Sequence, residues 1–150
     1  MEKEPLSLDS MYLFEGVGPE ALAMLALEVE EISCLEEEVI VEEGTFGNHL
    51  YVIAQGSVRV VMRLGREQET ELAVLKERDF FGEMCLLENV LRCASVQAVE
   101  PVVLYSLSRV SWHRFAESWP EEHAKVVMNT ARDLSKRLRV LDEAFLFPAP

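Results

Sequence analysis

Residues 81–96 read Phe-Gly-Glu-Met-Cys-Leu-Leu-Glu-Asn-Val-Leu-Arg-Cys-Ala-Ser-Val. A glycine stands directly before a carboxylate, a short apolar segment follows, and Arg92 opens an apolar strand. Gly82 allows backbone to approach a ligand closely, and amide N–H groups at the start of a short helix can receive negative oxygens. The guanidinium of Arg92 suits a phosphate, whereas ionised Glu83 only accepts hydrogen bonds and suits a hydroxyl. The pattern therefore indicates a ligand with both groups, first of all a nucleotide.

A second glycine-rich stretch lies upstream, at residues 40–56, and reads Ile-Val-Glu-Glu-Gly-Thr-Phe-Gly-Asn-His-Leu-Tyr-Val-Ile-Ala-Gln-Gly. Gly44 and Gly47 lie in a turn between two apolar runs, and Gly56 marks the next turn. By itself this stretch predicts only turns in which glycines supply a positive φ, because many β proteins place a glycine turn before an apolar strand. The stretch becomes informative because it precedes the motif of residues 81–96 in the chain.

Outside these stretches the chain continues as short apolar runs broken by glycines and charges, which is typical of strands. We expect strands at Glu38–Val41, Leu50–Ala54, Ser57–Leu64, Thr70–Leu75, Asp79–Phe81, Cys93–Ala98 and Val102–Leu107. Their even spacing predicts an all-β roll, barrel or sandwich. Helices are expected from Pro19, over Arg109–Glu117, and over about 119–145, where Ser118-Trp119-Pro120-Glu121 is typical of a capping box. The predicted fold class is mainly β with flanking helices.

The last helix repeats apolar residues in steps of three and four, which defines a heptad seam. The seam comprises Ala124, Val127, Ala131, Leu134, Leu138, Leu141 and Phe145. One interpretation is a helix that lies on the β-roll. The one we favour is a homodimer seam through Val127, Ala131, Leu134, Leu138 and Leu141, because the repeat continues beyond the length that a roll covers at about 1.5 Å per residue.

The bulk composition narrows the function classes. The 150 residues suit one domain, and the net charge of −13 repels DNA, RNA and anionic lipid, so direct nucleic-acid binding is not expected. No apolar run reaches the roughly 18 residues of a membrane-spanning helix. The first five residues lack a basic and apolar leader, and three cysteines without framework spacing suit a reducing compartment. We therefore expect a cytoplasmic protein that does not contact a membrane.

Together, the two motifs resemble the cyclic nucleotide-binding domain of catabolite-activator-type regulators, cyclic-nucleotide-dependent kinases and cyclic-nucleotide-gated channels. The resemblance rests on the pattern of Gly44, Gly47 and Gly56 and on the spacing from Phe-Gly-Glu to Arg-x-Ala between Phe81 and Ala94. It implies a β-roll of the double-stranded β-helix or jelly-roll type. It also implies a domain over residues 12–142, between an N-terminal tail at 1–11 and a C-terminal tail at 143–150.

The resemblance further implies a phosphate-binding cassette. In that cassette Arg92 binds the cyclic phosphate, Glu83 accepts the ribose 2′-hydroxyl, and backbone amides line the phosphate. The ligand-binding residues carried over in this way are Gly82, Glu83, Met84, Cys85, Arg92, Cys93 and Ala94. Four positions depart from the family pattern: Cys85, Asn89, Leu91 and Cys93. Since a thiol at position 93 is only a weak donor to a base, cyclic AMP is slightly favoured over cyclic GMP.

Other chemistries find little support in the sequence. His49, His113 and His123 lack the spacing of metal ligands, no nucleophile elbow is present, and three cysteines cannot complete an iron–sulfur site. We therefore expect no catalytic residue, no bound metal and no cofactor. A regulatory, signalling module is predicted, in which binding moves the C-terminal helix.

Family relatives that read DNA append a helix-turn-helix, and because this chain ends at Pro150 we expect its output to reach an unidentified protein partner. Candidates for covering the base are Met128, Thr130, Ala131 and Leu134. Two alternatives stay open. One is a ligand-free dimeric scaffold with a degenerate pocket, and the other is a sensor of redox state or haem, with Cys85 or Cys93 as the redox group.

Overall fold

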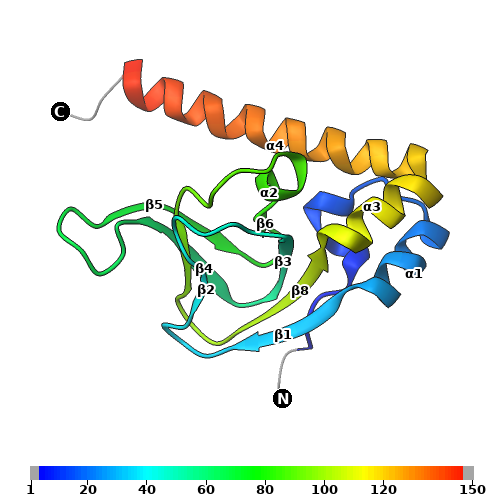
Figure 1. Cartoon of the computed structure of the whole chain (residues 1–150), viewed down its shortest axis with the longest axis horizontal. Coiled ribbons are helices and arrows are strands. Elements are labelled where there is room, and N and C mark those ends of the chain that lie inside the picture. The colour runs from blue at the N-terminus through cyan, green and yellow to red at the C-terminus, as the bar shows by residue number, and fades with distance from the viewer. Residues whose placement is uncertain (1–3, 147–150) are drawn as a thin grey trace.

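The computed structural model describes residues 4–146, apart from the side chain of Cys85, and shows a β-roll flanked by helices (Figure 1). Two short 3-10 helices come first, followed by one helix, eight strands with a short helix among them, and two final helices. In chain order the elements are η1 Leu8–Ser10, η2 Tyr12–Phe14, α1 Pro19–Glu28, β1 Glu30–Cys34, β2 Val39–Val41, β3 His49–Gln55, β4 Ser57–Met62, β5 Thr70–Lys76, β6 Phe80–Phe81, α2 Met84–Leu87, β7 Ser95–Ala98, β8 Val102–Ser108, α3 Arg109–Ser118 and α4 Pro120–Leu146.

The strands form two antiparallel sheets of four strands each, in the orders β1-β8-β3-β6 and β2-β7-β4-β5. Side chains alternate along β3 between two apolar cores. Ile53 faces the inner core, which both sheets share, whereas Leu50 and Val52 face an outer core shared with the helices. The predicted mainly-β roll with flanking helices is confirmed.

The outer core is where the N-terminal segment packs. We expected residues 1–11 to form a tail, but the part that the structure describes is attached to the roll. The amide of Leu6 donates to the carbonyl of Ala54 at 2.9 Å, and Leu8 and Met11 are buried. Their spacing follows a 3-10 turn rather than a helix or strand, so no sequence period revealed their burial.

The first half of helix α4 is attached to the N-terminal segment and the outer core, and its second half extends away from that core. The side-chain amide of Asn129 donates to the carbonyls of Leu13 and Glu15, both at 2.9 Å, and Val126 and Thr130 are buried. The helix then passes over α2 and extends to the edge of the molecule (Figure 1). It includes residues 143–146 of the predicted C-terminal tail, and residues 147–150 lie outside the described part of the chain.

Candidate functional site

The connection from β6 to α2 requires a glycine. Gly82 has φ +85°, a left-handed conformation that L side chains rarely adopt. A Cβ at this position would lie 2.8 Å from Nη1 of Arg92 and 2.9 Å from the carbonyl oxygen of His49. The glycine therefore allows the arginine to approach the backbone just before Glu83, whereas the sequence argument expected it to allow the approach of a ligand.

Gly47 has a different role from the one that its turn suggests. Gly44 and Gly56 have positive φ values of +83° and +89°, as expected for turn glycines. Gly47 does not, but a Cβ there would lie 2.0 Å from Nε and 2.1 Å from Cζ of Arg92. The prediction that these glycines only supply positive φ is therefore wrong for Gly47, whose missing side chain makes room for the guanidinium.

Arg92 joins the two motifs and is only 9% exposed. Its Nη2 donates to the carbonyl of His49 at 3.0 Å, and its Nη1 donates to the carbonyl of Gly82 at 3.4 Å. Its own backbone is held by the upstream turn, because its amide donates to the carbonyl of Thr45 at 2.8 Å. A guanidinium carries five N–H donors, so it can hold both carbonyls and still donate to an anion.

Glu83 is 5% exposed and lies beneath α4. Its Oε1 is 3.5 Å from Nη1 of Arg137, and Nη2 of the same arginine lies 3.5 Å from the carbonyl of Phe80. Burial raises the pKa of the Glu83 carboxyl, while the positive charges of Arg137 and, more weakly, Arg92 act to lower it. The carboxylate thus connects α2 with the long C-terminal helix.

Sequence reasoning missed Arg137. Its position on α4 is reinforced by an ion pair with Asp133, one helical turn earlier, at 2.8 Å, and its guanidinium stacks 5.9 Å from the ring centroid of Phe80. The acid–base pair at positions 133 and 137 was the available signal, but it also fits an ordinary exposed helix face.

A cavity of about 350 Å³ lies beside Arg92, on the side of the upstream turn. Its lining comprises Val39, Ile40, Val41, Glu42, Thr45, Phe46, Gly47, Asn48, His49, Tyr51 and Arg92. Glu83 and Met84 are not among these residues. The structure thus brings Arg92 against the backbone next to Glu83, but the two side chains do not line this cavity together.

The other predicted site residues vary in exposure. Met84 is 45% exposed, Cys93 is exposed and Ala94 is buried, whereas the Cys85 side chain lies outside the structural description. Of the residues proposed to cover the base, Thr130 is buried and donates to the carbonyl of Val126, one turn earlier.

The predicted dimer seam divides along α4. Val127 packs against the outer core and Leu134 is half-buried, whereas Ala131, Leu138 and Leu141 are exposed. The first half of the seam thus partly belongs to the core of this chain, and the second half is open.

No group of three or more His, Cys, Asp or Glu side chains within residues 4–146 is arranged to hold a metal ion. None of the helices in the same range combines the length and apolar character needed to cross a membrane.

Comparison with known proteins identifies the architecture. Residues 31–118 match the family model of the cyclic nucleotide-binding domain. The cyclic AMP receptor protein of Thermus thermophilus is 33% identical over 130 residues, which cover 87% of this chain and 58% of that protein. The CRP-like cAMP-activated global transcriptional regulator of Mycobacterium tuberculosis is 27% identical over 127 residues, covering 85% of this chain and 55% of the regulator.

Solved structures agree with these matches. The catabolite activator protein of Thermus thermophilus superposes with a TM-score of 0.75 at 33% identity, over 89% of this chain and 61% of that one. A cyclic nucleotide-binding domain from Methylobacillus flagellatus reaches a TM-score of 0.82 over 96% of this chain and 83% of that chain, although at 21% identity it supports the fold alone. The chain spans a little over half the length of the two bacterial regulators that it matches.

Proposed function

Because this chain belongs to the cyclic nucleotide-binding domain family, we propose that it is a regulatory module that binds a cyclic nucleotide, with cyclic AMP preferred, and that catalyses no reaction. The observation that carries the proposal is the buried guanidinium of Arg92, held against the carbonyl of Gly82 immediately before the buried carboxylate of Glu83. Relatives whose names include cyclic AMP support the choice of base.

Arg92 is proposed to bind the cyclic phosphate. A buried arginine is expensive unless it is paired, and here it is held by two neutral carbonyls rather than by a carboxylate. A phosphodiester would provide the missing negative charge through bidentate hydrogen bonds. The backbone amides of the cassette at Gly82, Met84, Cys85, Cys93 and Ala94 complete the proposed phosphate site.

Glu83 is proposed to accept the ribose 2′-hydroxyl. Its carboxylate now faces Arg137 at 3.5 Å, which is a long contact for a charged pair. A ribose hydroxyl that donates to Glu83 would therefore compete with Arg137 or join it. Either change alters the attachment of α4 at this point.

Helix α4 is proposed to carry the signal. A ligand shifts an equilibrium only by the difference between its affinities for the two states. Here the two states would differ in whether Arg137 contacts Glu83, and a nucleotide that binds Glu83 would have different affinities for them. In this scheme the helix moves to cover the base, using Met128, Ala131 or Leu134. The exposed Leu138 and Leu141, at 60% and 65%, support a homodimer seam along the same helix. The output then reaches a protein partner.

The experiment that tests ligand binding is thermal unfolding with cyclic AMP and with cyclic GMP. At a hundredfold excess over Kd, a ligand specific for the folded state adds about 2.7 kcal/mol of stability. We expect the larger shift with cyclic AMP. Arg92→Ala should weaken binding by roughly 3–5 kcal/mol, whereas Arg66→Ala, which removes an exposed arginine, should leave it unchanged.

The competing function is a scaffold with a degenerate pocket. It is favoured by the finding that Glu83 does not line the cavity beside Arg92. The absence of any shift with either nucleotide at millimolar concentration would support the scaffold, and tight binding that survives Arg92→Ala would show that the phosphate lies elsewhere.

A further inference from the structure

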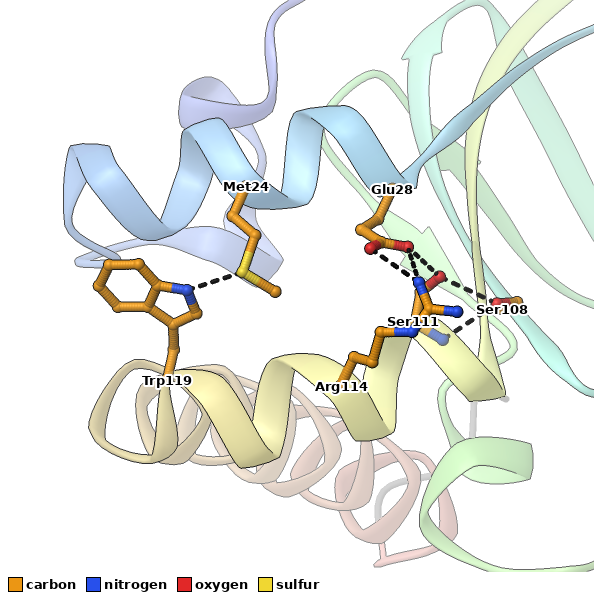
Figure 2. A network of polar contacts seen from close by, with 6 residues as sticks. All are labelled: Met24, Glu28, Ser108, Ser111, Arg114 and Trp119. Atoms are coloured by element: carbon orange, nitrogen blue, oxygen red, sulfur yellow. Dashed lines mark hydrogen bonds and ion pairs between the residues drawn. The ribbon is translucent and has the colours of Figure 1, made fainter.

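Helix α4 is attached firmly at its start. Trp119, directly before the helix, donates from Nε1 to Sδ of Met24 on α1 at 2.7 Å (Figure 2). The preceding helix α3 is attached to α1 as well, because Glu28 accepts from Oγ of Ser111 at 2.7 Å and from Nη1 of Arg114 at 3.0 and 3.2 Å (Figure 2). These contacts fix α3 and the beginning of α4 to the N-terminal helix.

The second half of α4 is attached differently. All residues from 135 to 146 are exposed, and the polar contacts described between this segment and the roll are those of Arg137. Its Nη1 lies 3.5 Å from Oε1 of Glu83, its Nη2 lies 3.5 Å from the carbonyl oxygen of Phe80, and its Cζ lies 5.9 Å from the centroid of the Phe80 ring. Loss of these contacts would therefore free the second half of α4 while the first half stays attached.

Arg137 lies on the solvent side of Glu83. Its side chain is 43% exposed, whereas that of Glu83 is 6% exposed. The distance of 3.5 Å between them exceeds the roughly 2.7–2.9 Å of a strong charge-assisted hydrogen bond, so the carboxylate can exchange this partner for a closer donor. The guanidinium would keep a partner after the exchange, because its Nε lies 2.8 Å from Oδ2 of Asp133 on the same helix. Displacement therefore leaves the arginine paired.

We propose, on the basis of the cyclic nucleotide binding proposed above, that Arg137 determines how this protein responds to the ribose 2′-hydroxyl. In the free protein the guanidinium occupies the carboxylate of Glu83. In the complex the hydroxyl takes its place, and the second half of α4 is released. The two groups compete because both donate hydrogen bonds, whereas ionised Glu83 only accepts them. A cyclic nucleotide with a 2′-deoxyribose would bind Arg92 through its phosphate but leave Arg137 in contact with Glu83.

This competition has a thermodynamic consequence that a purely structural contact lacks. Because binding of the hydroxyl and the Arg137 contact exclude each other, Arg137 lowers the affinity for cyclic AMP and leaves the affinity for 2′-deoxy cyclic AMP unchanged. An ion pair between partly exposed groups changes an equilibrium constant by up to about fivefold. We expect an effect of that size, since Arg137 is partly exposed.

The test is calorimetric titration with cyclic AMP and with 2′-deoxy cyclic AMP. Arg137→Gln should bind cyclic AMP about fivefold more tightly than the wild type and should bind the deoxynucleotide equally. The matched control is Arg139→Gln, because Arg139 is exposed and two residues along a helix correspond to about 200° of rotation, away from the roll. It should match the wild type with both nucleotides. Since burial raises the pKa of the Glu83 carboxyl, the buffer is mildly alkaline, to keep this group ionised in every variant.

The affinities distinguish failure of this proposal from failure of the proposed function. Unchanged cyclic AMP affinity in Arg137→Gln, or an equal gain for both nucleotides, would overturn the proposal, because neither result reports competition with the hydroxyl. A loss confined to cyclic AMP would also overturn it, since Arg137 would then assist the hydroxyl. In all three cases nucleotide binding itself remains. If the wild type bound neither nucleotide, the function proposed above would fail and this proposal with it.

A second measurement requires no variant. On saturation with cyclic AMP, amide hydrogen exchange of residues 135–146 in the wild type should change, whereas saturation with 2′-deoxy cyclic AMP should leave it as in the free protein. Equal changes with the two nucleotides would overturn the proposal, because release of α4 would then not depend on the hydroxyl.

Discussion

Gly47→Ala is the most direct test of how the two glycine motifs cooperate. The new Cβ would lie 2.0–2.2 Å from three atoms of the Arg92 guanidinium, closer than any real contact. The guanidinium must then move and give up its bonds to the carbonyls of His49 and Gly82. Overpacking of this kind typically costs about 1–3 kcal/mol, and we expect a loss of stability of that size. Nucleotide affinity should fall as well, because the phosphate ligand is displaced.

The assay is urea denaturation followed by circular dichroism, arranged as a double-mutant cycle with Arg92→Ala. When the guanidinium is absent, the alanine at position 47 no longer meets its three nearest atoms, so its cost should largely disappear. The two substitutions are therefore expected to be strongly non-additive. A Gly47→Ala protein as stable as the wild type would refute the reasoning, as would a cost that is unchanged in the Arg92→Ala background.

Three further predictions concern α4. His123 packs 4.4 Å from the ring of Trp112, and burial, with a smaller contribution from His113, lowers its pKa below 6.5. His123 therefore binds a proton less readily in the folded state than in the unfolded chain. The free energy of unfolding should be highest above about pH 6.5 and should decrease as the pH falls below that value, because protonation of His123 favours the unfolded chain. Urea midpoints at pH 7.5 and 5.5 should differ less in His123→Phe than in the wild type, and an identical difference would contradict this. Arg137→Ala leaves the buried Glu83 without its nearest cation, so it should raise the pKa of Glu83. The substitution should also weaken the attachment of α4, which is measured as faster amide exchange in the second half of the helix. Unchanged exchange would show that the pair is incidental. Leu141→Glu alters a side chain that is 65% exposed, so the fold should survive while sedimentation shows a monomer; an unchanged mass would place the dimer contact elsewhere or show that none exists.

Most of the fold could be predicted from the pattern of apolar and polar residues along the chain. Each of the seven predicted strands overlaps a strand of the structure, and the helices begin within a residue or two of Pro19, Arg109 and Pro120. The missed strand was β1, Glu30–Cys34, whose sequence Glu-Glu-Ile-Ser-Cys contains little β-propensity. It forms because all five residues pair with β8, which is a long-range effect that no local window contains.

The candidate site was predictable in part. The Gly82-Glu83 pair and Arg92 were recognisable from their spacing, and the structure buries both charged side chains. Their partners were not predictable. Arg137 reaches Glu83 across 54 positions, and Gly47 lies against a guanidinium that belongs to another loop. Sequence spacing describes neighbours along one element, whereas these contacts depend on how loops and helices pack.

The positions of seven strands along the chain, the resemblance to the family and the types of residue at the proposed phosphate and ribose positions could be predicted from the amino-acid sequence alone, because apolar alternation, glycine placement and motif spacing are local features of the chain. Tertiary structure decided which side chains face one another. It turned Glu83 towards α4, directed Arg92 towards the upstream turn, and aligned Ser106 with Glu30 across two strands. The physical reason is that burial and pairing energies depend on distances between segments that are far apart in the chain.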